Sequence, residues 1–364
     1  MHRKYTFDLM TAPLLQWYQR NARILPWRSD PTPYHVWLSE IMLQQTRVEA
    51  VKEYYHRFLI DIPDIATLAV IPEERLMKLW EGLGYYNRAR NLKKAAQIIL
   101  TEYHGQFPDN YDDILSLPGI GSYTAGAISS IAFSKPVPAV DGNVLRVTMR
   151  LSGSTADISS TRLKKEMEEI LKPVIPANCP GTFNQAIMDL GAMVCIPNGT
   201  PCCASPESEN VCPLSSICET CRRGLWASIP YKAPKKPRKI ENRTIVILEY
   251  QNCYSIQKRP EKGLLAGLWE FPSFDYHLSP DELDFTLGQE ELSVESLQLL
   301  GDARHIFSHI EWHMIGYLVH LSDDQKIPDS LSDLTFASPK ELAETYPLPN
   351  AFSFYQKKLP SPDR

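Results

Sequence analysis

The chain has 364 residues, with 38 Lys and Arg against 43 Asp and Glu and a formal net charge of -5. Its length exceeds that of one typical domain, so two domains are expected. No apolar run is long enough to span a membrane, and residues 1–15 lack the unbroken apolar core of a signal peptide. These features exclude the common membrane and secreted classes, and we expect a soluble, cytoplasmic protein.

The net charge hides an asymmetry along the chain. Residues 1–240 carry 28 Lys and Arg and 23 Asp and Glu, whereas residues 241–364 carry 10 and 20. The first part is therefore the candidate for binding a polyanion such as a nucleic acid.

The first candidate site lies on a helix. From residue 9 to about residue 190, apolar residues recur at intervals of three and four, which is a helical pattern. Thr32 and Pro33 predict the N-cap and first position of a helix that runs through Arg47. Glu40 shares its face of this helix with a mostly apolar set: Val36, Trp37, Leu43 and Gln44. Such a carboxyl group is desolvated and its pKa is raised; the alternative is a partly solvated glutamate at a helix edge.

A loop rich in glycine and aromatic residues follows at residues 80–86 (WEGLGYY). Leu83 and Tyr85, presented on a tight turn, could wedge between stacked bases of DNA. The alternative is an ordinary turn between helices whose aromatic side chains pack inward. The residues alone leave both interpretations open.

Two neighbouring stretches suggest anion binding and an acid. Residues 117–121 (LPGIG) place Gly119 and Gly121 before a helix over residues 123–132, so free N–H groups could hold a phosphate. Asp141 lies between a strand-like stretch, residues 136–140, and a helix-like one, residues 144–151. A carboxylate there is stabilised as an anion by the helix N-terminus. Taken singly, each feature could be only a turn or an N-cap.

The cysteines are concentrated in one window. Six of the eight lie between residues 195 and 221, and this clustering in an unsecreted chain favours a metal site over disulfides.

The basic, proline-rich residues 230–239 (PYKAPKKPRK) suit an extended linker. Beyond it the pattern changes to strands at residues 244–250, 253–258 and 312–321, which predicts an α+β second domain.

Several of these motifs, in this order, resemble one family. Residues 117–121 followed by Val140 and Asp141 resemble the helix-hairpin-helix signature of the endonuclease III superfamily of DNA glycosylases. Four further stretches are similar to the MutY-type adenine DNA glycosylases, which remove adenine mispaired with 8-oxoguanine: residues 25–28 (LPWR), 39–46 (SEIMLQQT), 80–86 and 183–186 (FNQA). The resemblance implies an all-α glycosylase domain over residues 1–225, a linker over 226–240 and a Nudix-like domain over 241–364.

The resemblance also implies catalytic roles. Glu40 would protonate the leaving adenine at N7, and Asp141 would stabilise the oxocarbenium-like sugar or bond to it, before water completes hydrolysis. Tyr123 stands where bifunctional relatives carry a lysine, so base excision without efficient strand cleavage is expected. Asn143 would orient Asp141 or the attacking water. One protonated and one charged carboxyl group is also the division of labour that glycoside cleavage needs.

Binding residues follow from the same resemblance. The pocket for the flipped adenine would be lined by Arg23, Leu25, Trp27, Arg28 and Gln185. The DNA and the 8-oxoguanine would be contacted by Gln45, Leu83, Tyr85, Leu117, Gly119, Gly121, Phe307, Ser308 and His309. The implied partner is double-stranded DNA with an A·8-oxoguanine or A·G mispair, bound by a monomer associated with the nucleoid.

A [4Fe–4S] cluster is the cofactor that the resemblance implies. The family spacing is Cys-x6-Cys-x2-Cys-x5-Cys, and here an insertion over residues 204–211 interrupts it. The assigned ligands are Cys195, Cys202, Cys212 and Cys218. Cys203 could replace Cys202, Cys221 is spare, and a four-thiolate zinc site or a loop without metal are the alternatives.

The second domain resembles the family's Nudix-like segment at residues 263–272 (GLLAGLWEFP). It lacks the acidic cluster of a metal-binding Nudix box, so hydrolysis of nucleotide diphosphates is not expected.

Two other functions compete with adenine excision. One is a pyrimidine-damage glycosylase with lyase activity, and the other is a DNA-binding protein without enzymatic activity.

Overall fold

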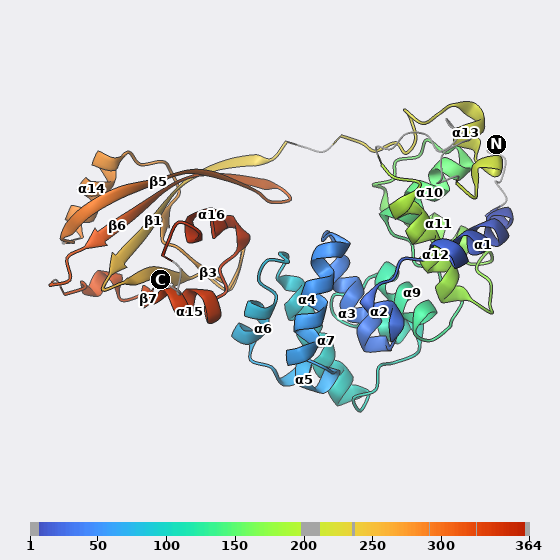
Figure 1. Ribbon diagram of the computed structural model, residues 1–364, viewed down its shortest axis with the longest axis horizontal. Coiled ribbons are helices and arrows are strands. Elements are labelled where there is room, and N and C mark those ends of the chain that lie inside the picture. Colours follow the sequence, from blue (N-terminus) through green and yellow to red (C-terminus); the bar gives the residue numbers. More distant parts are fainter. Residues whose placement is uncertain (1–6, 198–211, 235–236, 291, 325, 361–364) are drawn as a thin grey trace. The chain divides into compact units, whose positions relative to one another are not determined.

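The computed structural model describes residues 7–197, 212–234, 237–290, 292–324 and 326–360 (Figure 1). It divides into two compact units, the first formed by Met1–Val70 with Asn91–Pro234 and the second by Ile71–Arg90 with Lys235–Arg364. None of the helices in these described ranges has the length and apolar character needed to cross a membrane. The proposed ligands Cys202 and Cys203, and the insertion over 204–211, lie outside the described residues.

The first unit is built from helices. Its core gathers fully buried side chains from both ends of the unit, among them Met10, Leu14, Phe183 and Leu190. The first turn of α7 belongs to the second unit. The helices are η1 (Phe7–Met10), α1 (Thr11–Asn21), α2 (Pro26–Ser29), α3 (Pro33–Leu43), α4 (Val48–Asp61), α5 (Ile65–Val70), α7 (Asn87–Glu102), α8 (Tyr111–Ser116), α9 (Ser122–Ile131), α10 (Gly142–Ser152), α11 (Thr161–Leu171), α12 (Pro180–Met193), η2 (Ser215–Ile217) and α13 (Glu219–Arg223).

Helix α3 begins where the sequence predicts but ends earlier. The Thr32 side chain accepts a hydrogen bond from the backbone N–H of His35, and Pro33 occupies the first helical position. The prediction that the helix runs through Arg47 is wrong, because Gln45 has a φ of 62°, a left-handed conformation that breaks the helical hydrogen-bond pattern. The chain turns there and starts again as α4.

The stretch at residues 136–140 is not a strand, which corrects a second expectation. Its backbone packs closely against α9, where a Cβ on Gly126 would lie 2.1 Å from the carbonyl oxygen of Pro138. The apolar residues are therefore buried by contact with a helix, without any strand partner. This packing brings the chain to Asp141 at the start of α10.

The second unit contains a seven-stranded mixed sheet with the order β3-β2-β1-β6-β5; β4 pairs with β1, and β7 with β2. Strands β1 and β6 are parallel, and the other pairs are antiparallel. The strands are β1 (Lys239–Tyr250), β2 (Cys253–Lys258), β3 (Trp269–Glu270), β4 (Ser273–Phe274), β5 (Val294–Ile306), β6 (Ile310–Leu321) and β7 (Thr335–Ala337). Strand β1 starts at Lys239, so it begins before the end of the linker predicted over residues 226–240 and ahead of the strand predicted at residues 244–250.

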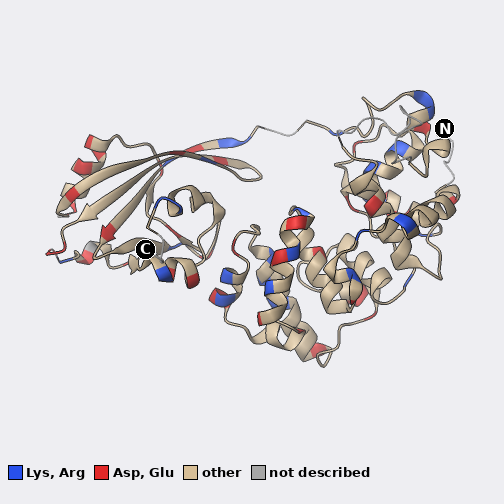
Figure 2. Cartoon of the chain, in the orientation of Figure 1, with Lys and Arg blue, Asp and Glu red and all other residues tan. Residues whose placement is uncertain are grey.

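Both faces of the sheet are buried. Ile245 and Ile247 of β1 pack on one side, and Val246 and Leu248 pack on the other. This alternation is the period of two that a strand imposes. The first side is covered by α15 (Pro339–Glu344), η4 (Asn350–Phe352) and α16 (Ser353–Gln356), and the second by α14 (Pro280–Gln289), on which Figure 2 shows several acidic residues.

The segment at residues 71–90 packs with this sheet unit. It contains α6 (Glu73–Leu79) and the loop over residues 80–86. The Lys78 ammonium group donates to the carbonyl oxygens of Leu342 and Tyr346, both at 3.1 Å, and the Glu81 carboxylate accepts from the backbone N–H of Leu348 at 2.8 Å. These contacts hold the aromatic loop to the second unit.

Candidate active site

A cavity of about 750 Å³ opens in the first unit. Its wall includes many residues predicted for the site, contributed by α2, α3, α9, α10 and α12. Those lining it are Arg23, Leu25, Trp27, Arg28, Glu40, Gln45, Gly121, Tyr123, Asp141, Asn143 and Gln185. The structure therefore brings the two predicted acids to one cavity large enough for a purine.

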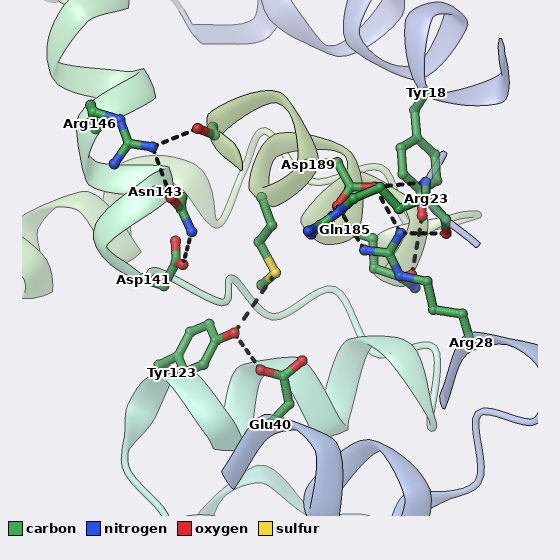
Figure 3. Close-up of polar contacts among 12 residues, drawn as sticks. Tyr18, Arg23, Arg28, Glu40, Tyr123, Asp141, Asn143, Arg146, Gln185 and Asp189 are labelled. Atoms are coloured by element: carbon green, nitrogen blue, oxygen red, sulfur yellow. Dashed lines mark hydrogen bonds and ion pairs between the residues drawn. The ribbon is translucent and has the colours of Figure 1, made fainter. Parts of the chain in front are cut away.

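Glu40 is buried, as its apolar helix face predicts. Glu40 is 6 % exposed, and this burial raises the pKa of its carboxyl group to about 7. The charge of Asp141 acts in the same direction. A hydrogen bond donated by the Tyr123 hydroxyl group to Glu40 Oε2 and the positive charge of Arg28 oppose the rise (Figure 3). The carboxyl group can thus hold or release a proton near neutral pH.

Asp141 caps helix α10 with its side chain. One carboxylate oxygen accepts from the backbone N–H of Val144 and the other from the Asn143 amide, both at 2.7 Å. Burial raises the pKa of Asp141, while these donors and the charge of Arg146 lower it, and burial prevails. The helix N-terminus therefore favours the anion, as expected, but does not outweigh the burial of the group.

Arg146 holds Asn143 in place, and the sequence analysis did not identify it. Its guanidinium group donates to Asn143 Oδ1 at 2.8 Å, to the carbonyl oxygen of Gly191 at 2.6 Å and to that of Cys195 at 2.7 Å. The spacing of three residues between Asn143 and Arg146 puts both side chains on one face of the helix, and this spacing could have indicated their contact.

Asp189, on α12, was also missed. It is completely buried and pairs with both Arg23 and Arg28, which line the cavity. Arg28 lies over the ring of Tyr18, whose hydroxyl group donates to Gln185 Oε1 at 3.2 Å. An acid four residues after Gln185, on a helix whose other residues are uncharged, was the signal that could have identified it.

Two family profiles match the chain, one in each half. The profile of the HhH-GPD superfamily of base excision DNA repair proteins matches residues 38–173, and that of the NUDIX domain matches residues 243–356. The adenine DNA glycosylase of Buchnera aphidicola from Schizaphis graminum is 36 % identical over 319 residues, which cover 87 % of this chain and 89 % of that protein. The adenine DNA glycosylase of Mus musculus is 36 % identical over 350 residues, with 82 % and 68 % covered.

The chain belongs to the adenine DNA glycosylase family. It is a DNA N-glycosylase, an enzyme of adenine excision in base excision repair. A thermostable thymine-DNA glycosylase has a similar solved structure, with a TM-score of 0.53, 27 % identity, and 59 % of this chain and 96 % of that chain covered. A non-covalent endonuclease III–DNA complex (TM-score 0.52, 22 % identity, 62 % and 99 % covered) shares the fold. The resemblance to the adenine DNA glycosylases is confirmed, and so is the predicted fold class of a helical glycosylase domain with a Nudix-like α+β domain.

Other predicted DNA contacts of this glycosylase are not among the residues that line the cavity. Leu117 is buried, and Gly119 has a φ of 78° with Asn91 packed where a side chain would lie. In the loop over residues 80–86, Tyr85 is 49 % exposed but Leu83 is 5 % exposed. Leu83 therefore packs inward, which is the alternative that the residues alone left open, and its contact with DNA stays a prediction.

The predicted 8-oxoguanine loop joins β5 to β6 in the second unit of the glycosylase. Phe307 packs edge-on against Trp312 with ring centroids 4.8 Å apart, whereas Ser308 and His309 are exposed. The Ser308 hydroxyl oxygen lies 3.5 Å from that of Tyr85. The structure thus joins two separately predicted recognition residues within one unit.

The described cysteines of the glycosylase gather without completing a metal site. Cys195, Cys212 and Cys218 are buried in one hydrophobic cluster, with Cys221 packed beside it. Arg150 donates to the Cys195 sulfur at 3.4 Å and accepts from the Cys218 thiol at 3.3 Å through its carbonyl oxygen. Buried thiols beside a cation suit a soft metal, but over the described ranges no three His, Cys, Asp or Glu side chains form a metal site.

Proposed function

We propose that the enzyme excises adenine opposite 8-oxoguanine or guanine in double-stranded DNA by hydrolysis, without efficient strand cleavage. The observation that carries this proposal is the shared cavity of Glu40 and Asp141, in which burial raises the pKa of Glu40 to about 7. An acid that is protonated near neutrality and a second carboxyl group held by N–H donors match the needs of N-glycoside cleavage.

The proposed reaction begins when adenine leaves the base stack and enters the cavity beside Arg28 and Gln185. The Glu40 carboxyl group donates its proton to adenine N7 as the bond between C1′ and N9 breaks, and the bonding electrons stay with adenine. The Asp141 carboxylate stabilises the positive charge on the sugar. Water then adds to C1′, and its proton returns to Glu40, which restores the acid for the next cycle.

Tyr123 supports a hydrolytic outcome. Strand cleavage through a Schiff base requires an amine at the sugar, and Tyr123 offers a phenol that donates to Glu40. Burial raises the pKa of Tyr123 well above its ordinary value, so the hydroxyl group stays protonated and remains a donor. We infer that it orients the acid without forming a covalent bond.

Recognition of the opposite base is assigned to Ser308, His309 and Tyr85. 8-Oxoguanine differs from guanine by a proton on N7 and a carbonyl at C8, which call for an acceptor and a donor respectively. A hydroxyl group and an imidazole supply both. Their exposure, and the approach of Ser308 to Tyr85, support a role at the DNA surface.

A [4Fe–4S] cluster held by Cys195, Cys202, Cys212 and Cys218 is proposed as a structural cofactor, with zinc as the alternative. When bound, it would tie four thiolates together near Arg222 and Arg223 and take no part in the chemistry. Anaerobically purified protein should contain about four iron atoms per chain and show visible charge-transfer absorption. Zinc in place of iron, or neither metal, would contradict the assignment.

One experiment separates the three functions that the sequence leaves in competition. A duplex with a single A·8-oxoguanine pair is incubated with the protein, and half of each sample is then treated with hot alkali. Strand scission only after alkali is expected, because hydrolysis leaves an intact abasic strand. Scission without alkali would indicate a lyase, and no scission in either half would indicate a protein that only binds DNA. A matched duplex with T opposite 8-oxoguanine is the control.

A further inference from the structure

Asp189 takes no part in the proposed reaction, yet both of its carboxylate oxygens accept hydrogen bonds from arginines. Its Oδ1 accepts from Arg23 Nε at 2.8 Å and from Arg28 Nη2 at 2.9 Å. Its Oδ2 accepts from Arg28 Nη1 at 2.8 Å and from the backbone N–H of Arg23 at 3.2 Å. The Arg28 pairing is bidentate, which is the most directional form of an ion pair (Figure 3).

These contacts fix the arginines where they line the cavity. Arg28 is pinned further by its donation to the carbonyl oxygen of Arg23 at 3.1 Å and by its position over Tyr18, 5.8 Å from the ring centroid. Burial alone would raise the pKa of Asp189, but the hydrogen bonds and charges of the two arginines lower it, so the group is ionised. A buried carboxylate with two cationic partners is a fixed anchor.

Arg28 also lies close enough to Glu40 for its charge to lower the pKa of that acid. The other groups that face Glu40 are Tyr123 from α9 and Asp141 from the start of α10. Asp189 is the only acid that pairs with Arg28 among the contacts described above, and without it the guanidinium group would turn to the remaining acids of the cavity. Glu40 would then be held as a carboxylate.

We propose that Asp189 is a positioning residue for adenine excision, which holds the Arg23 and Arg28 guanidinium groups in the cavity wall and keeps the Arg28 group away from the Glu40 carboxyl group. The inference rests on the proposed role of Glu40 as the acid. It predicts that Asp189 acts on the pH dependence of the reaction, which a residue of purely structural importance would leave unchanged.

The test is the pH profile of single-turnover adenine excision in Asp189→Asn. Arg28 loses its counter-charge, the pKa of Glu40 falls, and the proton needed for catalysis is lost at lower pH. The alkaline limb of the profile should therefore move down by about one pH unit, so the rate above the limb falls about tenfold. An alkaline limb at the native position, with or without a uniform loss of rate, would overturn the proposal.

Two controls show whether the effect passes through Arg28. Arg23→Met removes one partner of Asp189 but leaves Arg28 paired, so the limb should stay at its native pH. In an Arg28→Gln background, adding Asp189→Asn should produce no further shift, because the displaced charge is absent. A shift that persists without Arg28 would contradict the proposed route.

A conservative variant covers the case in which Asp189→Asn does not fold. Asp189→Glu keeps the negative charge but moves it by one methylene, so weaker binding of a mispaired duplex with an unmoved limb is expected. A moved limb, or native binding together with a native rate, would overturn the anchoring role. Failure of the native protein to release adenine would instead defeat the proposed function. A native profile retained in both Asp189 variants would defeat only the inference.

Discussion

The cavity around Glu40 and the loop at Phe307, Ser308 and His309 are built differently. Glu40 is 6 % exposed, receives a hydrogen bond from Tyr123 and shares a cavity with Asp141, which has two donors of its own. Ser308 and His309 are exposed. The Ser308 hydroxyl oxygen lies 3.5 Å from the hydroxyl oxygen of Tyr85.

The difference shows which contacts exist before DNA binds and which form only with DNA. Donors and charges that are fixed before the substrate arrives act on the transition state without reorganisation, so the cavity is ready for chemistry. The exposed loop must gain its contacts from DNA, and each contact formed there replaces one to water. Changes in the cavity should therefore alter rates strongly, whereas changes in the loop should alter preference modestly.

The largest effect is expected from Glu40→Gln. The amide fills the same space and can still contact Tyr123, but it cannot donate a proton to the leaving base. Single-turnover excision should fall about a thousandfold, while the Kd for an A·8-oxoguanine duplex stays within a few-fold of native. Glu49→Gln, an exposed side chain on α4, is the matched control. Substantial turnover in Glu40→Gln would refute the acid's role.

The same variant should stabilise the fold at high pH. Burial raises the folded-state pKa of Glu40 from 4.5 to about 7, so the native protein binds this proton more tightly than the unfolded chain does. Native stability therefore falls as the pH rises from 4.5 to 7 and then levels off. Glu40→Gln should increase the free energy of unfolding by about 2–3 kcal/mol at pH 8 and hardly at all at pH 4. Equal effects at both pH values in urea unfolding would contradict this.

A smaller effect is expected from Tyr123→Phe. The hydrogen bond from Tyr123 lowers the pKa of Glu40, so its loss should raise that pKa and move the alkaline limb of the excision rate to higher pH. Poorer orientation of the acid should lower the plateau rate about tenfold. Tyr18→Phe, which removes a hydroxyl group that contacts Gln185, should leave the limb in place. A downward shift in Tyr123→Phe would be evidence against this electrostatic relation.

The same contrast explains how much could be predicted from the sequence. Glu40 and Asp141 follow local rules, since one lies on an apolar helix face and the other caps a helix, and both were identified with their environments. The end of α3 was missed because helical periodicity does not reveal a single left-handed residue such as Gln45.

Long-range polar contacts account for the other omissions. Asp189 and Arg23 are 166 residues apart in the chain, and Arg146 reaches a carbonyl group 49 residues away, so no local pattern pairs them. The inward packing of Leu83 has the same cause, because residues 71–90 are organised by contacts with strands and loops more than 150 residues later. Helix and cap rules describe one element at a time.

The smallest effect is expected from Ser308→Ala with His309→Ala in the exposed loop. The double variant should lose a few-fold to about tenfold of its preference for adenine opposite 8-oxoguanine over adenine opposite guanine, because the exchangeable hydrogen bonds lost from an exposed loop are together worth about 1 kcal/mol. Its rate on a pre-bound A·G duplex should stay near native, since the cavity is untouched. The comparison of Kd and single-turnover rate on the two duplexes measures both quantities. An equal loss of rate on both duplexes would mean that the loop supports the chemistry, and the division between a preformed acid site and a DNA-dependent recognition surface would fail.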